Sequence, residues 1–366
     1  MRLDDLNIRQ VLTSDLQRTV EVEIKTKNGI SYSSAPVYKN GIYRMRCLPA
    51  EDSVRKFLEI KRHFLNQSFM DIQDVDDFLH DIDISVDFRE IGGNLAFAIS
   101  SAFLKAFAKS DGKEVYEYMS NDASKIPAPI GVFVNKTVFE SDFKEFMLYP
   151  VQQKNFSNDM LKLVDVKNGF EIDKNMTTDK MLKKLSGLTT KNSLHLGIAF
   201  GANELWNGRK YVYSGTGENL SSQEQLLLIQ DIVGNYPVGY VEDPFHGDDF
   251  VLFATLTHRL PTRLVSGNEL YSNNIERFKN GADMKSTSCI TINPSHISTI
   301  TDIINLVREA RKHMMTIVMD ITGNNDALFS HLAVCMGVDY VKIGLGDKIV
   351  SNANELLRIE GKLAVA

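Results

Sequence analysis

The sequence has few cysteines and no long apolar run. Cys47, Cys289 and Cys335 are the only cysteines among 366 residues, too few and too scattered for a disulfide framework or a Cys-based zinc site. No stretch of about 18 or more apolar residues occurs, so we expect no transmembrane helix. The polar N-terminus MRLDDLNIRQ lacks the hydrophobic region of a signal peptide. These absences predict a protein of the reducing cytoplasm.

The sequence also lacks an excess of positive charge. Lys and Arg number 41 against 47 Asp and Glu, which gives a formal charge of −6 and excludes the strongly basic pattern of dedicated nucleic-acid binders. Apolar residues make up 43% and charged residues 24%, as in globular proteins, so the chain is not disordered. At about 150 residues per domain, the length predicts two domains, or one barrel with an added domain.

The N-terminal third changes its hydrophobic period once. Polar and apolar residues alternate over 18–26 and resume over 30–37 after an Asn-Gly turn, which predicts a β-hairpin. Apolar residues then recur at helical spacing through 51–119, and the segment 94–107 is apolar nearly all round, as in a buried helix. We therefore predict a small α+β domain over residues 1–124.

The rest of the chain, 125–366, begins with the proline-containing linker KIPAPI and alternates short apolar runs with helical patterns. The eight strand candidates are 130–135, 145–151, 194–200, 238–244, 263–269, 289–293, 315–321 and 340–344. Such alternation is typical of a (β/α)8 barrel, here irregular because the first two candidates leave no room for a helix between them. An open doubly wound sheet is the alternative, but no Gly-rich fingerprint follows a strand to support it.

Several motifs, in order along residues 6–363, resemble those of the enolase family. VEDPFHGDDF resembles IEDPFDQDDW, KEFMLYPV resembles QEFMILPV, GGNLAFAIS resembles GANAILAVS, and ELLRIEGKL resembles QLLRIEEEL. The resemblance implies an α/β protein in which an enolase-like irregular TIM barrel follows an N-terminal α+β domain. It also implies dehydration of 2-phosphoglycerate to phosphoenolpyruvate, supported by two Mg²⁺ ions, and a homodimer formed through the N-terminal domain.

Carried over residue by residue, the resemblance implies an incomplete metal site. The three carboxylate ligands of the family correspond to Ala199, Glu242 and Asn268. Glu242 is retained, Ala199 cannot ligate, and Asn268 offers only an uncharged carbonyl oxygen. The site therefore keeps one negative charge of three.

The catalytic positions implied by the resemblance are also altered. Glu145 and Lys342 are retained, whereas the base lysine corresponds to Asn293, which cannot take a proton at neutral pH. The general-acid glutamate corresponds to Lys167, and the histidine of the family's SHRSGE loop to Asp320. Ile321 and Thr322 occupy the phosphate-binding positions, so the arginine that grips the phosphate is replaced by an apolar side chain.

These substitutions leave three hypotheses. The first is a non-catalytic enolase-like protein with a binding, regulatory or structural role, for which we predict no cofactor and interpret Glu242 and Lys342 as a partly buried salt bridge. The second is an enolase with a rearranged, Mg²⁺-dependent site. The third is a divergent lyase or racemase of the wider superfamily with Lys144 or Lys167 as its base. Apart from a second copy of the chain, the sequence does not indicate a binding partner.

Overall fold

The computed structural model describes residues 1–14, 16–37, 45–120, 125–136, 141–173, 176–323, 326–345 and 350–365. The chain divides into two compact units. The first consists of Met1–Lys125, Asn293–Arg308 and Asn324–Gly337, and the second of Ile126–Ile292, Glu309–Gly323 and Val338–Ala366. The first unit thus includes two segments from the C-terminal half of the chain. The linear boundary between residues 124 and 125 stays a prediction.

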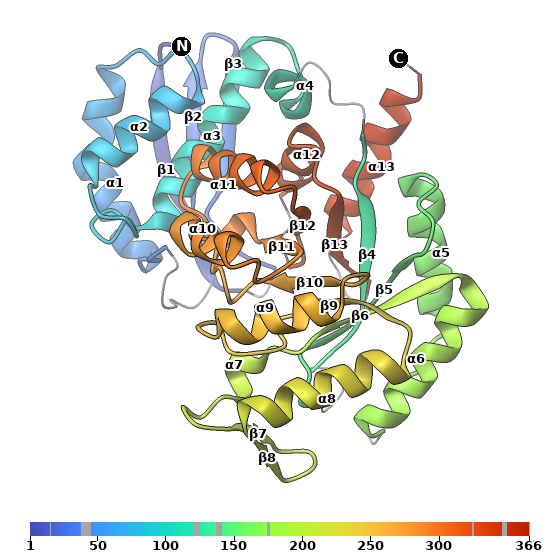
Figure 1. The fold of residues 1–366 in the computed structure, drawn as a ribbon. Coiled ribbons are helices and arrows are strands. Elements are labelled where there is room, and N and C mark those ends of the chain that lie inside the picture. Colours follow the sequence, from blue (N-terminus) through green and yellow to red (C-terminus); the bar gives the residue numbers. More distant parts are fainter. Residues whose placement is uncertain are drawn as a thin grey trace. The chain divides into compact units, whose positions relative to one another are not determined.

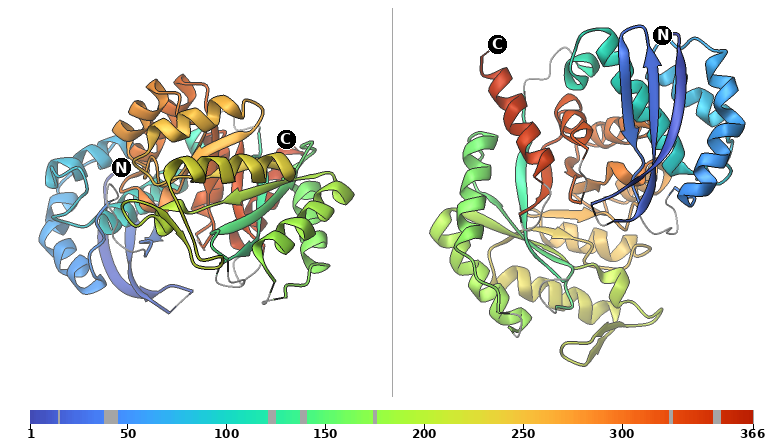
Figure 2. Two further views of the ribbon diagram at one scale, coloured as in Figure 1. Left: turned by 60° about the horizontal axis from the view of Figure 1, so that its bottom comes forward. Right: turned by 180° about the vertical axis from the view of Figure 1, so that it is seen from behind.

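The first unit contains an antiparallel sheet in the order β1-β2-β3, coloured blue in the right panel of Figure 2. Its strands are β1 (Asp5–Leu12), β2 (Arg18–Thr26) and β3 (Gly29–Ser34). Its helices are α1 (Ala50–Leu65), α2 (Ile72–Ile82), α3 (Gly93–Ser110), α4 (Val115–Met119), the 3-10 helix η1 (Pro294–His296), α12 (Leu328–Cys335) and the first part of α11 (Ile300–Lys312).

The alternation along β2 explains which face of this sheet is buried. Val20, Val22 and Ile24 are fully buried, because every second side chain of a strand points to the same face. The predicted hairpin is confirmed, and Gly29 at its turn has a φ of +116°, a conformation that favours glycine. Helix α3 is buried along nearly its whole length, as its apolar composition predicts. The sequence analysis missed β1, which adds a third strand.

The second unit is built on a closed eight-stranded barrel in the order β10-β11-β12-β13-β4-β5-β6-β9. All eight strand candidates of the sequence form this barrel, so the predicted fold is confirmed. The strands are β4 (Ala128–Asn135), β5 (Glu145–Pro150), β6 (Leu194–Ala199), β9 (Val238–Glu242), β10 (Leu264–Gly267), β11 (Cys289–Ile292), β12 (Thr316–Asp320) and β13 (Tyr340–Gly344). Only β5 runs antiparallel to its neighbours, which accounts for the irregular first half of the pattern.

Helices pack on the outside of this barrel, where Figure 1 shows α5 and α6 along its green strands and α8 and α9 along its yellow ones. The remaining elements of the second unit are α5 (Phe156–Asn168), α6 (Thr178–Asn192), α7 (Ala202–Leu205), the hairpin β7 (Tyr211–Tyr213) and β8 (Glu218–Leu220), α8 (Ser222–Asn235), α9 (Phe250–Arg259), α10 (Ile275–Asp283) and α13 (Ser351–Leu363). No helix in the described ranges is long and apolar enough to cross a bilayer.

The interior of the barrel is mostly apolar. Its core cluster consists of buried side chains from most of the strands: Ile130, Val132, Met147, Tyr149, Ala199, Tyr240, Cys289 and Val318. Glu242, Asp320 and Lys342 are also buried, each at or near the carboxyl end of its strand. In barrels of this class that end carries the active site, so it is the place to look for function.

Candidate active site

The strand register places three of the expected site residues in a row at the mouth of the barrel. Ala199, the last residue of β6, pairs with Glu145 on one side and with Glu242 on the other. Glu145 is the first residue of β5, and it reaches the same rim as the carboxyl ends of β6 and β9 only because β5 is antiparallel. Asp320 and Lys342 pair in the same way on β12 and β13.

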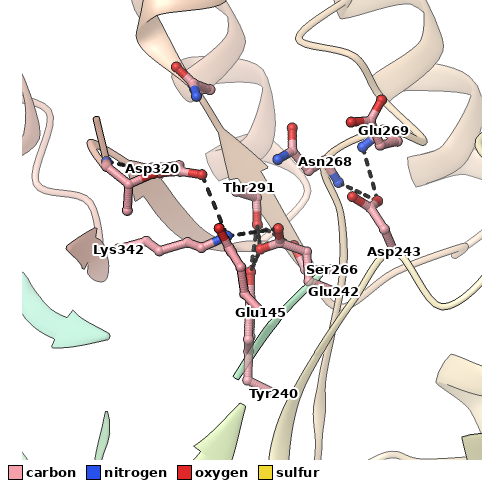
Figure 3. Close-up of polar contacts among 12 residues, drawn as sticks. Glu145, Tyr240, Glu242, Asp243, Ser266, Asn268, Glu269, Thr291, Asp320 and Lys342 are labelled. Atoms are coloured by element: carbon pink, nitrogen blue, oxygen red, sulfur yellow. Dashed lines mark hydrogen bonds and ion pairs between the residues drawn. The ribbon is translucent and has the colours of Figure 1, made fainter. Parts of the chain in front are cut away.

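Lys342 lies among three of these carboxylates, and Figure 3 shows its ammonium group pointing between them. Its Nζ is 2.5 Å from Glu145 Oε2, 3.0 Å from Glu242 Oε1 and 3.5 Å from Asp320 Oδ2. The lysine side chain is only 1% exposed, so water screens these ion pairs weakly. We call Glu145, Glu242, Asp320 and Lys342 the mouth cluster.

The charges of the mouth cluster keep the lysine protonated. Burial by itself would lower the pKa of Lys342, but the negative charges of Glu145, Glu242 and Asp320 outweigh it and raise this pKa well above its usual value. An ammonium group held in this state is a fixed positive charge and a poor general base.

Glu242 is held from a second side by hydroxyl groups. Its Oε2 accepts hydrogen bonds from the hydroxyl of Tyr240 and, at 3.2 Å, from that of Thr291, which in turn lies 2.8 Å from Ser266 Oγ. Burial, followed by the charge of Glu242, raises the pKa of Tyr240 well above its usual value, so this phenol stays a donor. The sequence analysis missed these partners, although Tyr240 lies two residues before Glu242 and so shares its face of the strand.

Asp243 is a further buried carboxyl that the sequence analysis gave no role. Its Oδ1 accepts from the backbone N–H groups of Asn268 and Glu269, each at 2.9 Å. Burial, and then the charges of Glu242 and Glu269, raise its pKa, while the charge of Lys144 acts in the opposite direction. Its φ of +46° is uncommon for a residue other than glycine. Asp243 thus fixes the loop that presents Asn268 at the end of β10.

Several other expected site residues make contacts of their own. Lys167 lies in the last turn of α5, where its Nζ donates to the carbonyl oxygen of Phe133 at 2.6 Å. Ile321 is buried, and the Thr322 hydroxyl donates to Asp320 Oδ1 at 2.6 Å. Asn293 directly follows β11, and its Oδ1 accepts from the backbone N–H of Ser295, which caps the next turn.

The side chains at the expected metal position do not fit a Mg²⁺ ion held by three carboxylates. Ala199 contributes only a methyl group, and the one retained ligand, Glu242, is bonded to Lys342, Tyr240 and Thr291. Asn268 Oδ1 is buried and accepts no hydrogen bond from the described residues, which makes it the remaining uncharged oxygen ligand. Among the described residues, no group of three or more His, Cys, Asp or Glu side chains is arranged to hold a metal ion.

Comparison with known proteins agrees with this architecture. The family model "Enolase, N-terminal domain" matches residues 3–119, and "Enolase, C-terminal TIM barrel domain" matches residues 172–366. The enolase of Thermoplasma acidophilum is 30% identical, covering 98% of this chain and 98% of its own length. The enolase of Methanosphaera stadtmanae is 28% identical, covering 99% of this chain and 97% of its own.

These matches correct one expectation, the absence of a cofactor. The enolase family is Mg²⁺-dependent, so the matches point to Mg²⁺ as the cofactor of the family, and the prediction that the chain takes none is wrong. That prediction rested only on the substitutions at Ala199 and Asn268. Substitution of two metal-ligand positions in one chain does not change which cofactor the family uses. Two family models that together match most of the chain, with a relative 30% identical over nearly its full length, show that the chain belongs to the enolase family.

Proposed function

We propose that this enolase-family protein does not dehydrate 2-phosphoglycerate and acts instead as a non-catalytic homologue with a binding, regulatory or structural role. The observation that supports this most directly is the state of the mouth cluster. Its three carboxylates share the buried ammonium group of Lys342, so one of their three negative charges is compensated within the chain and each carboxylate already has a cationic partner.

The substitutions around the mouth cluster also disfavour catalysis. The reaction removes a weakly acidic proton next to a carboxylate, and this needs a base together with strong stabilisation of the enediolate that forms. Asn293 at the base position cannot accept a proton, and Ala199 supplies no oxygen to a metal ion. Ile321 offers a phosphate group neither charge nor a hydrogen bond. Each loss lowers the rate by itself, and such losses are not additive.

The test is a direct assay of phosphoenolpyruvate formation. The purified chain is mixed with 2-phosphoglycerate and excess Mg²⁺, beside the enolase of Thermoplasma acidophilum as a positive control. We expect no turnover above background. Turnover of about 1 s⁻¹, the low end for enzymes, that EDTA abolishes would overturn the proposal.

Restoring the family's residues provides a second test. Asn293→Lys alone is expected to leave the protein inactive, since a base without metal ligands still faces an unstabilised enediolate. The triple variant Ala199→Asp, Asn268→Asp, Asn293→Lys is expected to give a trace of activity at most. Full activity after the single change would show that the remaining site is intact and contradict the proposal.

We also propose that the chain forms a homodimer through its N-terminal sheet domain and works in the cytoplasm, as the resemblance to enolases implies. Light scattering after size exclusion tests the first point. A mass of about twice the 41.2 kDa of one chain supports the dimer, and a mass equal to one chain contradicts it.

A further inference from the structure

A cavity lies in the barrel unit, and the described residues that line it include none of the mouth cluster. This cavity, of about 750 Å³, is lined by residues from α6, α8, the β7–β8 hairpin and the segment just before β5. We call it the α6–α8 groove. Its volume falls within the range of about 300–1,000 Å³ that is typical of small-molecule sites.

The apolar part of the α6–α8 groove is its floor. Phe143, Leu182 and Ile232 line it and are each at most 6% exposed, and half-buried Leu228 lies beside them. The ring of Tyr213 is also buried and is in edge contact with that of Phe143. A surface of this kind favours the apolar body of a ligand, and its aromatic rings attract cations.

The charged part is acidic and lies nearer the solvent. Among the described residues that line the groove, Asp142, Asp179, Glu218 and Asp231 are acidic and Lys183 is the single cation, which leaves three negative charges in excess. Lys183 is already paired with Asp179, its Nζ lying 2.7 Å from Asp179 Oδ2.

The other three carboxylates bond only to neutral donors in the contacts that the structure describes. Asp142 accepts from the backbone N–H of Gly215 at 3.2 Å, Glu218 from Thr216 Oγ1 at 3.3 Å, and Asp231 from Asn235 Nδ2 at 2.9 Å. Each of these bonds leaves lone pairs and a full negative charge on the carboxylate. The electrostatic complement of such a rim is a cation.

We propose that the α6–α8 groove binds a small organic cation, an amine or guanidine carried on an aromatic or aliphatic body. The body packs on Phe143, Leu182, Leu228 and Ile232, and the cation faces Asp142, Glu218 and Asp231. An anionic metabolite such as a sugar phosphate is excluded by the same charges. This proposal does not depend on the state of the mouth cluster.

The test compares three probes with the same phenylethyl body: 2-phenylethylammonium, neutral 2-phenylethanol and anionic 3-phenylpropanoate. Binding to the full chain is followed by methyl NMR on Leu- and Ile-labelled protein. We expect shifts at Leu182, Leu228 and Ile232, with the cation bound about fivefold more tightly than the alcohol and the anion not bound. That preference corresponds to about 1 kcal/mol, the upper range for exposed ion pairs, and it should vanish near 1 M salt, where the Debye length is about 3 Å.

Matched variants separate the charged rim from the apolar floor. The double variant Asp231→Asn, Glu218→Gln is expected to reduce the preference for the cation to about twofold or less, because two exposed carboxylates are removed without a change of shape. Asp283→Asn, which removes an exposed carboxylate outside the groove, should leave the preference for the cation unchanged. Leu228→Ala should weaken the binding of the cation and of the alcohol alike by about threefold, because it removes part of one apolar contact. Leu227→Ala, 55% exposed on the same helix, is the control.

The outcomes decide the proposal without reference to activity. Equal affinity for the cation and the alcohol, or shifts confined to methyl groups outside the groove, would overturn it, as would an unchanged preference in the double carboxylate variant. If Leu228→Ala fails to fold, the three probes on the unmodified chain still give the answer, because the charge preference and the position of the shifts are measured there.

Discussion

Two sites of the chain, one in each unit, bury ionisable groups in opposite ways. In the barrel unit, Lys342 is buried with three carboxylates around its ammonium group. In the first unit, Asp76 on α2 is fully buried beside hydroxyl and amide groups: its Oδ2 accepts from the backbone N–H of Thr301 at 2.8 Å, and its Oδ1 has no hydrogen-bond partner among the described residues.

The difference shows what decides whether a buried group stays charged. The pKa of Lys342 rises, because the surrounding carboxylates outweigh the cost of burial and favour the charged form. Burial instead raises the pKa of Asp76 to about 7, with a small further contribution from the charge of Asp302, since its hydrogen bonds do not compensate for lost solvation. A counter-ion thus preserves the charge, and hydroxyl groups alone do not.

The largest expected effect comes from removing the lysine of the mouth cluster. Lys342→Met leaves three carboxylates at the barrel mouth without their cation, and breaking a buried ion pair in this way costs about 3–5 kcal/mol of unfolding free energy. Urea unfolding followed by the fluorescence of Trp206, the only tryptophan, reports on the barrel unit.

The matched control is Lys191→Met, the same substitution at an exposed position of α6, which should change the unfolding free energy little. A Lys342→Met variant as stable as this control would mean that the mouth cluster does not depend on the ammonium group.

The second prediction concerns Asp76 and pH. Its folded-state pKa of about 7 lies above the usual value, so its contribution to stability is complete below about pH 4 and is lost as the pH rises to 7. Asp76→Asn removes the titration and keeps an acceptor for Thr301 N–H, so above pH 7 it should raise the unfolding free energy of the first unit by roughly 4 kcal/mol.

Hydrogen exchange of the α2 and α3 amides between pH 5 and 8 measures this effect as the difference between parent and variant. Asp77→Asn, one residue further along α2 and exposed, is the control and should keep the pH slope of the parent. A slope unchanged in Asp76→Asn would show that Asp76 is ionised in the folded protein.

The sequence predicted the barrel because its information is local and periodic. Each apolar run from 130–135 to 340–344 became a strand, and the family motifs supplied the order. The antiparallel direction of β5 could not be predicted from spacing, because the alternation of side chains is the same in both directions. The first strand, β1, was missed since its polar residues outnumber its buried ones.

The candidate site was predictable in its members and in one of their contacts, the ion pair between Glu242 and Lys342, which is confirmed. Glu145, Glu242 and Lys342 were named from the resemblance, and the full cluster depends on the register of β5, β9 and β13, which carry them. Tyr240 and Thr291 were missed, because a tyrosine and a threonine in a strand are ordinary core residues unless a charge lies opposite. Lys167 was assigned to the site from a loop motif, whereas the structure places it in a helix.

The third prediction compares two buried tyrosines, one whose hydroxyl donates to a charged group and one whose hydroxyl is paired with a neutral group. Tyr240→Phe removes the hydroxyl that donates to Glu242, and bonds to charged groups contribute about 1.5–3 kcal/mol. Tyr271→Phe removes an equally buried hydroxyl that is paired with Thr287 at 2.6 Å, and should cost about 0.5–1.5 kcal/mol. Urea unfolding of both variants tests the order. Equal losses would show that the charge of Glu242 does not strengthen the bond.

The smallest effect is expected where a similar ion arrangement is exposed. Arg9 on β1 lies 2.7 Å from both Glu21 and Glu23 on β2, so one cation again serves several carboxylates, but its side chain is 47% exposed against 1% for Lys342. Water screens these ion pairs, so Arg9→Gln should lower the unfolding free energy by less than about 1 kcal/mol. Raising the salt to about 1 M should abolish the difference in stability between the variant and the parent. Hydrogen exchange of the β1 and β2 amides at low and high salt gives the measurement. A loss as large as that of Lys342→Met would contradict the comparison, because burial would then not be what makes the mouth cluster strong.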